Sequence, residues 1–305
     1  MSRDWESTLR AWAKPPSQSE RERCANAESM VRKAVRASDA LAEHEVEVFL
    51  QGSYRNNTNV RAESDVDVCV RCMDVFWASH PFDPSLTDSE MGIRDDPTGY
   101  TFPQFKSDVE AALRRHFGRA GVSRGDKAIH VSENSYRVEA DVVAAFEQRR
   151  YQRFSSGTVD YFSGTAFVTD AGKRIQNWPH QHYENGVEKN KATGQRFKAM
   201  VRALKSLHNE MVEHDAVQLP SFLLESLVWN VPTELFGSSE YSRDLFNVLE
   251  WLRAGLASDE GCNDWVEVND LKYLFRGGAQ PWSRPDAELF VGQAWHYLRI
   301  TGASQ

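Results

Sequence analysis

Three aspartates in the first half of the chain have the spacing of a metal site. Asp65 and Asp67 stand two residues apart in DVDVCVRCMDVF, whose alternation indicates a strand, so their carboxylates point to one side. Like charges this close repel each other, and a divalent cation between them relieves the repulsion. Oxygen ligands suit Mg2+. Asp141, in the strand-like segment RVEADVVAAF, would complete a two-metal site from a neighbouring strand.

A glycine and a serine ahead of these carboxylates have the chemistry of a phosphate cradle. Gly52 and Ser53 end the alternating segment EVEVFLQGS, where backbone N–H groups and a hydroxyl can face a triphosphate. Glycine lets the phosphate approach without a Cβ in the way. Asp-x-Asp alone is common on surfaces, and Gly-Ser alone indicates little. Their combination, with eleven residues between and Asp141 later, predicts attack of a ribose hydroxyl on the α-phosphate of a nucleoside triphosphate.

The elements that must position these residues alternate between helix and strand. Ala, Glu and Arg dominate a helical segment that Ser17 or Ser19 would cap. In the first half we expect helices over 18–43 and 102–117, strands over 45–53, 65–76, 127–132 and 137–143, and a loop over 79–101.

The second half reads as helical. Residues 147–195 show little periodicity, and helices are expected over 194–213, 220–231, 239–256, 264–275 and 284–300. The chain therefore divides into a catalytic core with its N-terminal helix, 1–165, and a helical C-terminal domain, 166–305. The expected fold class is α+β.

Composition excludes several classes of protein. No run of 18 apolar residues suggests a membrane span, and the N-terminus lacks the apolar core of a secretory signal, so we expect a cytoplasmic protein that does not act at membranes. Four cysteines in 305 residues are too few for a disulfide scaffold. The net charge of −8 argues against binding duplex DNA.

The string FLQGSYRNNTNVRAESDVDV resembles the signature of polymerase-β-like nucleotidyltransferases. More narrowly, it is similar to bacterial cyclic-oligonucleotide synthases related to cyclic GMP-AMP synthase and oligoadenylate synthase, the CD-NTases. RFKAMVRALKSLHNE and LPSFLLESLVWNV resemble later helices of that family. The resemblance implies a mixed-sheet palm with helices, an all-helical C-terminal half, and an active site in a cleft between the two lobes.

The resemblance also assigns roles to residues. It implies that Asp65, Asp67 and Asp141 hold two Mg2+ ions, for which Mn2+ can substitute, and that Gly52 and Ser53 bind the triphosphate. Glu139, on the same side of its strand as Asp141, is a secondary candidate for the metal shell.

In the helical half, the family has a triphosphate-binding lysine on the helix expected at 194–213. Lys198 is the first choice and Lys205 the second, although a solvated basic face is the simpler explanation for that side of the helix. Ser221 would touch the γ-phosphate or only cap its helix, and Phe222 would stack on a base.

Two motifs have no role in the nucleotidyl transfer described above. Cys69 and Cys72 form a C-x-x-C, which we interpret as two thiols on a buried strand rather than as a zinc site, because no second ligand pair has matching spacing. His180-x-His182 lies in 171–194, which we interpret as an ordered loop shaping the acceptor and base pocket rather than as a metal site.

The function expected from this resemblance is synthesis of a cyclic di- or trinucleotide second messenger from nucleoside triphosphates, ATP among them, for antiphage signalling through a downstream effector. The sequence does not decide whether the enzyme also needs a regulatory partner. The alternatives are a nucleotidyltransferase acting on an RNA, protein or small-molecule acceptor, and a degenerate nucleotide-binding module. Neither the bases, nor the linkage, nor the ring size follows from the sequence.

Overall fold

The computed structural model describes residues 3–60, 65–79, 82–93, 99–277 and 280–300. The chain forms two compact units. The sheet unit comprises Ser17–Arg55 and Ser64–Pro179, and the helical unit comprises Met1–Pro16, Asn56–Glu63 and His180–Gln305. This division differs from the expected boundary after residue 165, because two strands continue the sheet beyond it and because two early segments pack within the helical unit.

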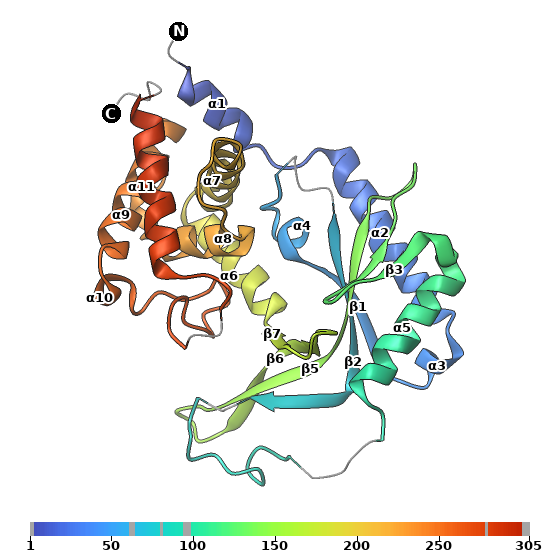
Figure 1. Cartoon of the computed structure of the whole chain (residues 1–305). Helices are drawn as coiled ribbons and strands as arrows, with labels where there is room; N and C mark the ends of the chain where they lie inside the picture. Colours follow the sequence, from blue (N-terminus) through green and yellow to red (C-terminus); the bar gives the residue numbers. More distant parts are fainter. Residues whose placement is uncertain (1–2, 61–64, 80–81, 94–98, 278–279, 301–305) are drawn as a thin grey trace. The chain divides into compact units, whose positions relative to one another are not determined.

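The described residues of the sheet unit form one seven-stranded sheet (Figure 1). Its strands are β1 (Val46–Gln51), β2 (Val66–Ser79), β3 (Val122–Arg124), β4 (Ile129–Val131), β5 (Ala140–Arg153), β6 (Val159–Val168) and β7 (Arg174–Asn177). The order is β1-β2-β5-β4-β3, with β6 paired to β5 and β7 to β6. β2 and β5 run parallel, and the other neighbours are antiparallel.

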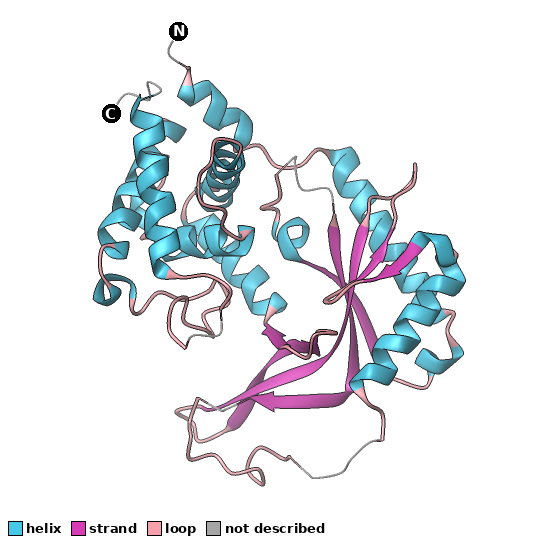
Figure 2. Cartoon of the chain, in the orientation of Figure 1, coloured by secondary structure: helices cyan, strands magenta, loops and turns pink. Residues whose placement is uncertain are grey.

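Three helices cover one face of this sheet (Figure 2): α2 (Gln18–Arg36), α3 (Asp39–Ala42) and α5 (Phe102–Phe117). Alternate residues of β2 supply the core beneath them, and Val66, Val68 and Val70 are fully buried. α2 begins with a capping box in which the Ser17 side chain accepts the Glu20 N–H and Glu20 accepts the Ser17 N–H at 2.7 Å. Ser17 is therefore the cap of this helix.

The predictions for this half are confirmed in type, with changed bounds. The helix at 102–117 is confirmed, whereas the helix expected over 18–43 ends at Arg36 and α3 follows it. The strand predictions are confirmed, but β5 continues to Arg153. Residues 147–195, which show little periodicity in the sequence, nevertheless form regular elements. They contain the rest of β5, β6, β7 and a helix, α6 (Pro179–Ala192).

The helical unit contains α1 (Trp5–Trp12), most of α6, α7 (Arg196–Val212), α8 (Ser221–Asn230), α9 (Tyr241–Leu256), α10 (Asp259–Cys262) and α11 (Arg284–Ile300). The expected apolar stripe of α7 is buried at Phe197, Met200, Leu204 and Leu207. These side chains form one core with residues of α1, α8, α9 and α11. Burial of this stripe is what makes α7 the central helix of the unit.

The helix expected over 264–275 is wrong. Val266 and Tyr273 form an isolated antiparallel bridge, and the Glu267 N–H donates to the Lys272 carbonyl at 2.9 Å. Asp270 closes the turn with a φ of +58°. The local hydrogen-bonding ability of Asn and Asp side chains favours such a turn over a helix.

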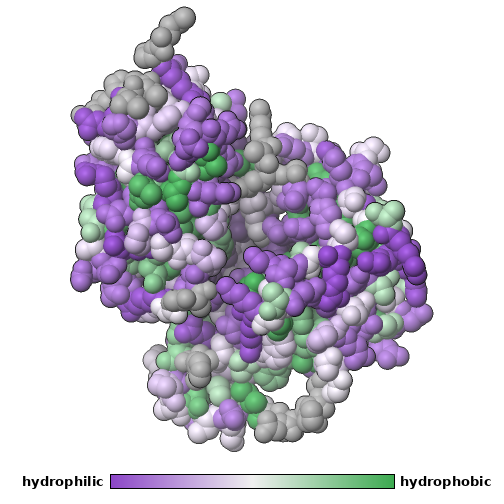
Figure 3. Space-filling model, viewed as in Figure 1, coloured by the Kyte–Doolittle hydropathy of each residue, from purple (hydrophilic) through white to green (hydrophobic). Residues whose placement is uncertain are grey.

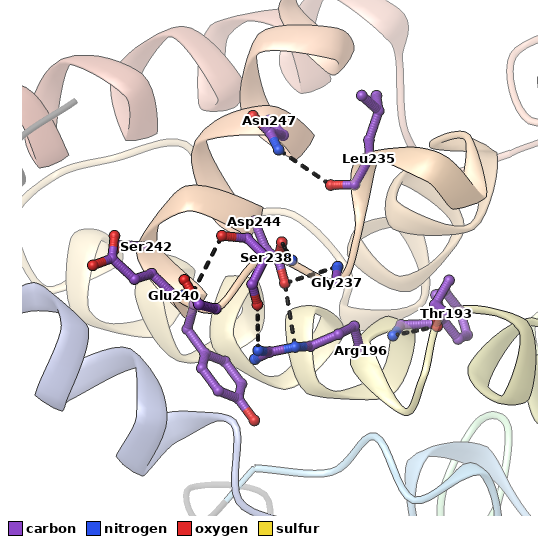
Figure 4. Close-up of polar contacts among 12 residues, drawn as sticks. Thr193, Arg196, Leu235, Gly237, Ser238, Glu240, Ser242, Asp244 and Asn247 are labelled. Carbon is purple, nitrogen blue, oxygen red and sulfur yellow. Dashed lines mark hydrogen bonds and ion pairs between the residues drawn. The ribbon is translucent and has the colours of Figure 1, made fainter.

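A buried carboxylate fixes the start of α9 in the helical unit (Figure 4). Asp244 accepts the N–H groups of Ser238 at 2.8 Å and Gly237 at 3.3 Å, and it pairs with Arg196 of α7 at 3.4 Å. Arg196 also donates to the Ser238 carbonyl at 2.7 Å. The segment before α9 is thus tied to the first turn of α7.

Hydrophilic residues cover most of the face shown in Figure 3, in keeping with hydrophobic cores inside each unit. Among the described residues, no helix combines the length and the apolar character needed to cross a bilayer.

Candidate active site

Four residues form one row across the middle of the sheet. Gln51 of β1 pairs with Asp67 of β2, Asp67 pairs with Asp141 of β5, and Asp141 pairs with His130 of β4. Residues paired across neighbouring strands point to the same face, and adjacent strands lie about 4.8 Å apart. The sheet therefore brings the carboxylates of Asp67 and Asp141 side by side, as their spacing and types predicted.

Asp65 stands at the entry to β2 and is exposed. Its neighbour Val66 is held in the ladder by an N–H donated to the Glu139 carbonyl at 3.0 Å. Asp65 and Asp67 thus flank the first residue of the strand, next to the start of β5 that carries Asp141. All three carboxylates belong to the sheet unit, close to one end of the β2–β5 pair.

Gly52 directly follows β1 and lies against Asp67. Its φ is +67°, and a Cβ at this position would fall 2.0 Å from Asp67 Oδ2. Only glycine fits, both because of the left-handed backbone and because the carboxylate occupies the space of a side chain. Ser53 follows in the short helix α4 (Gly52–Asn56). The Gly-Ser turn therefore lies next to the three carboxylates of Asp65, Asp67 and Asp141, which we call the acidic row, and both are parts of one site.

The sequence reading missed His130. Its Nδ1 lies 3.1 Å from Asp141 Oδ1, and its Nε2 lies 2.5 Å from Glu139 Oε1. Two carboxylates can accept from both ring nitrogens only when the imidazole carries both protons. The hydrogen bond to Asp141, followed by that to Glu139, raises the pKa of His130. The sequence signal that could have revealed His130 is its place between two apolar strand residues, Ile129 and Val131, which the structure shows to be fully buried.

The donor set of this row fits a hard divalent cation. Asp65, Asp67 and Asp141 offer only oxygen ligands, and the missing Cβ of Gly52 lets the Asp67 carboxylate lie against the backbone. Such oxygen ligands match Mg2+, which binds proteins through a few carboxylates and completes its shell with water and substrate phosphates. His130 hydrogen-bonds to Oδ1 of Asp141, so a cation held by this carboxylate would use Oδ2.

The predicted nucleotide-binding residues of the second half lie in the helical unit. Lys198 and Lys205 are 7% and 1% exposed, so the alternative of a solvated basic face is wrong for them. Arg202 between them donates to the Ala13 carbonyl at 2.6 Å, which shows how the N-terminal segment covers this side of α7. Burial lowers the pKa of Lys198, and its Nζ lies 5.5 Å from the centre of the Tyr183 ring.

Lys205 takes part in a buried polar cluster around Glu225 of α8. Glu225 accepts from Thr58 at 2.8 Å, pairs with His182 at 3.0 Å, and lies 3.9 Å from Lys205 Nζ. Burial alone would raise the pKa of Glu225, but His182, with Lys205 and Thr58, lowers it to about 2. The segment 171–194, expected to be an ordered loop, thus contains β7 and α6, and His182 of α6 hydrogen-bonds to the buried Glu225.

Ser221 and Phe222 open α8. Pro220 stands at the N-cap position and Ser221 is the first helical residue, so the capping alternative for Ser221 is wrong. The Phe222 ring lies 5.6 Å from the His182 ring and 5.8 Å from Trp282. Phe222 therefore belongs to an aromatic group in the helical unit, and its contact with a base stays a prediction.

The two cysteines of the C-x-x-C do not converge. Residues three apart in a strand point to opposite faces, and both Cys69 and Cys72 are buried within β2. The reading of two separate thiols on a buried strand is confirmed.

Comparison with known proteins adds to this geometry. Residues 184–299 match the family model of the cGAS/DncV-like nucleotidyltransferase C-terminal helical domain. A Legionella pneumophila protein named cyclic dipyrimidine nucleotide synthase CdnE is 43% identical over 98% of this chain and 99% of the relative. A Cecembia lonarensis protein of the same name is 40% identical over 98% of this chain and 100% of the relative.

Solved structures agree with the sequence relatives. The structure of Elizabethkingia meningoseptica CdnE cyclic dinucleotide synthase with GTP and Apcpp has a TM-score of 0.78 at 35% identity, covering 97% of this chain and 99% of that chain. The fold expected from the sequence, a polymerase-β-like mixed sheet with a helical C-terminal domain, is confirmed. With an acidic row beside a Gly-Ser turn and relatives that match along nearly its whole length, the chain belongs to the cGAS/DncV-like nucleotidyltransferases, the CD-NTases, and among them to the CdnE cyclic nucleotide synthases.

Proposed function

We propose that this chain joins two nucleoside triphosphates into a cyclic dinucleotide, that at least one of its bases is a pyrimidine, and that catalysis depends on Mg2+. The observation that carries the chemistry is the side-by-side pairing of Asp67 and Asp141 next to Gly52. The names of the Legionella and Cecembia relatives, at 43% and 40% identity, support pyrimidine substrates. ATP stays a candidate for the second position, since the Elizabethkingia structure holds GTP and Apcpp.

Asp65, Asp67 and Asp141 would hold the Mg2+ ions, or Mn2+ in their place. When bound, such ions favour the deprotonated ribose hydroxyl and neutralise the triphosphate. Gly52 and Ser53 orient the triphosphate through the backbone and the Ser53 hydroxyl. The hydroxyl oxygen then forms a bond to the α-phosphorus as the bond to pyrophosphate breaks, and a second transfer closes the ring.

His130 acts here as a positioning residue. It holds Asp141 Oδ1 at 3.1 Å while Glu139 holds the other side of its ring at 2.5 Å. Groups that hydrogen-bond to a metal-ligating carboxylate fix its orientation, and their loss typically weakens metal affinity or activity about 10–100-fold. His130 therefore keeps Asp141 Oδ2 available for the metal and for the proton of the ribose hydroxyl.

In the helical unit we propose Lys198 as the triphosphate-binding lysine, with Ser221 beside the γ-phosphate and Phe222 against a base. Lys198 has no carboxylate within ion-pair distance among the described residues, which suits a group that meets an anionic substrate. Lys205 is the weaker choice, because it lies 3.9 Å from Glu225 and is almost fully buried. The cyclic product would signal to a nucleotide-sensing effector in antiphage defence.

The decisive experiment incubates the purified chain with all four radiolabelled nucleoside triphosphates and Mg2+, followed by phosphatase and mass spectrometry. We expect a phosphatase-resistant cyclic product that names the bases. The double variant Asp65→Asn, Asp67→Asn should lower its formation on the order of a thousandfold or more. The exposed carboxylate variant Asp88→Asn is the matched control and should keep full activity.

Two other outcomes would contradict parts of this proposal. Label transferred to added RNA, protein or a small acceptor, with no cyclic product, would replace this proposal by an acceptor-directed transferase. A purely purine product would overturn the base assignment while leaving the synthase reaction in place.

A further inference from the structure

A second group of metal-binding side chains lies in the sheet unit, outside the acidic row. In the part of the chain that the structure describes, one nitrogen, one sulfur and one oxygen of His44, Cys72 and Asp74 lie within 4.8 Å of one another. Cys72 stands five residues beyond Asp67 along β2, and nucleotidyl transfer makes no use of it.

An irregularity in β2 builds this group. Cys72 pairs with Phe146 and Phe76 pairs with the next residue of β5, Glu147, so β2 has three additional residues, 73–75, at this point. The additional residues include Asp74, whose carboxylate lies near the Cys72 thiol. A strand bulge that re-aims side chains is a feature often found beside functional sites.

The remaining two ligands are held from the other side. His44 precedes β1, and its Nδ1 lies 2.9 Å from Asp74 Oδ2, while the Glu45 N–H donates to both oxygens of Asp74. The His44 ring stacks on Tyr100, with centroids 3.9 Å apart and 10° between the planes. The ring and the carboxylate therefore have fixed directions before any ligand arrives.

The three side chains differ in how far they are buried. Cys72 is fully buried, but the side chains of His44 and Asp74 are 22% and 38% exposed.

We propose that His44, Cys72 and Asp74 form a binding site for a thiophilic divalent cation, best matched by Zn2+, with water as its fourth ligand. Zinc takes sulfur at about 2.3 Å and nitrogen or oxygen at about 2.0 Å, which places ligand atoms roughly 3.5 Å apart. The three ligand atoms lie within 4.8 Å of one another, so binding would draw the thiol, the ring and the carboxylate together. Thiolate and imidazole ligands favour Zn2+ over Mg2+, so this site would not compete with the acidic row.

Binding replaces one proton. A cysteine binds a metal as the thiolate, so the Cys72 thiol gives up its proton on binding. The sulfur–metal bond forms as the S–H bond breaks, and the proton goes to solvent. No oxidation or reduction takes place. The ion would clamp the entry of β1 to the bulge of β2.

The test uses the full chain, stripped with a chelator and titrated with Co2+, a spectroscopic substitute for Zn2+. We expect one equivalent to give a thiolate-to-cobalt charge-transfer band, which Zn2+ then displaces. Cys72→Ser should abolish the band. His44→Ala should weaken Co2+ binding at least about tenfold, since it removes one of three protein ligands. His44 lies partly exposed outside the hydrophobic core, so this variant keeps the proposal testable if Cys72→Ser does not fold.

Cys69→Ser is the matched control, because it alters the other cysteine of the C-x-x-C and should keep the band. Three outcomes would overturn the proposed metal site. The wild-type protein could show no band at micromolar Co2+, the band could persist in Cys72→Ser, or the band could be lost only in Cys69→Ser. The Asp65→Asn, Asp67→Asn variant should retain the band, so a failure of the nucleotidyltransferase proposal would be seen separately.

Discussion

The Asp67 carboxylate fills the space where a side chain on Gly52 would begin: a Cβ at Gly52 would lie 2.0 Å from Asp67 Oδ2. Gly52→Ala must therefore push the Asp67 carboxylate, which we propose to be catalytic, away from its place beside Asp141. We expect product formation to fall about 100-fold or more, comparable with other losses of a positioned catalytic group.

Gly92→Ala separates this effect from backbone strain. Gly92 has the same φ of +67°, but a Cβ there meets nothing within 4 Å. Both variants should lose about 1 kcal/mol of stability from the left-handed conformation. Equal loss of activity in the two variants would show that the contact with Asp67 is unimportant.

His130→Ala should raise the Mg2+ concentration needed for half-maximal activity about 10–100-fold, because Asp141 loses the partner of its Oδ1. The KM for nucleotide at saturating Mg2+ should change little. Mn2+ binding followed by electron paramagnetic resonance gives a readout that does not depend on turnover, and it should weaken in parallel.

Two further variants define the role of His130. His130→Asn keeps a donor near the position of Nδ1 and should restore part of the metal affinity. His116→Ala, an exposed histidine on α5, serves as the control. An unchanged metal requirement in His130→Ala would refute the positioning role while leaving the carboxylate assignment untouched.

Lys198 and Lys205 should differ in what they contribute. Lys198→Met should raise the KM for nucleoside triphosphate about tenfold or more, the scale of a lost charged hydrogen bond. Its folding stability should change little, because burial already lowers the pKa of Lys198 and disfavours its charge.

Lys205→Met should instead lower the free energy of unfolding by about 1–3 kcal/mol, because it removes a buried cation near Glu225. Chemical denaturation and steady-state kinetics on both variants check this division. The reverse pattern would make Lys205 the triphosphate-binding residue.

Glu225 should make the helical unit sensitive to acid. The folded protein holds its pKa at about 2, against an ordinary value of 4.5. A lowered folded pKa contributes stability that is present above pH 4.5 and is lost as the pH falls toward 2, here about 3 kcal/mol. Glu225→Gln should remove this slope and lower stability at neutral pH.

Tryptophan fluorescence during urea unfolding at several pH values measures this effect, since seven of the nine tryptophans lie in the helical unit and only Trp77 and Trp178 in the sheet unit. Glu213→Gln, an exposed carboxylate, is the control and should keep the wild-type slope. A slope that survives in Glu225→Gln would assign the acid sensitivity to other groups.

The sequence by itself determined the features that depend on local periodicity. Two aspartates at strand spacing must share a face, and the stripe from Phe197 to Leu207 must seek a core, so β2 and α7 were predictable. Gly52 was expected to admit a phosphate, which stays a prediction, whereas the structure shows the Asp67 carboxylate in the space of its missing Cβ. The helix at 179–192 was not, because polar side chains on most of its surface leave no apolar stripe.

Only the tertiary structure decided which strands became neighbours. The parallel pairing of β2 with β5 sets Asp67 beside Asp141, and the antiparallel pairing of β4 adds His130, which no spacing in the sequence connects to either. The burial of Lys198 and Lys205 was likewise decided by the segments that cover α7. Strand pairing and helix packing join residues far apart in the chain, and their registers depend on the whole hydrophobic pattern rather than on any local motif.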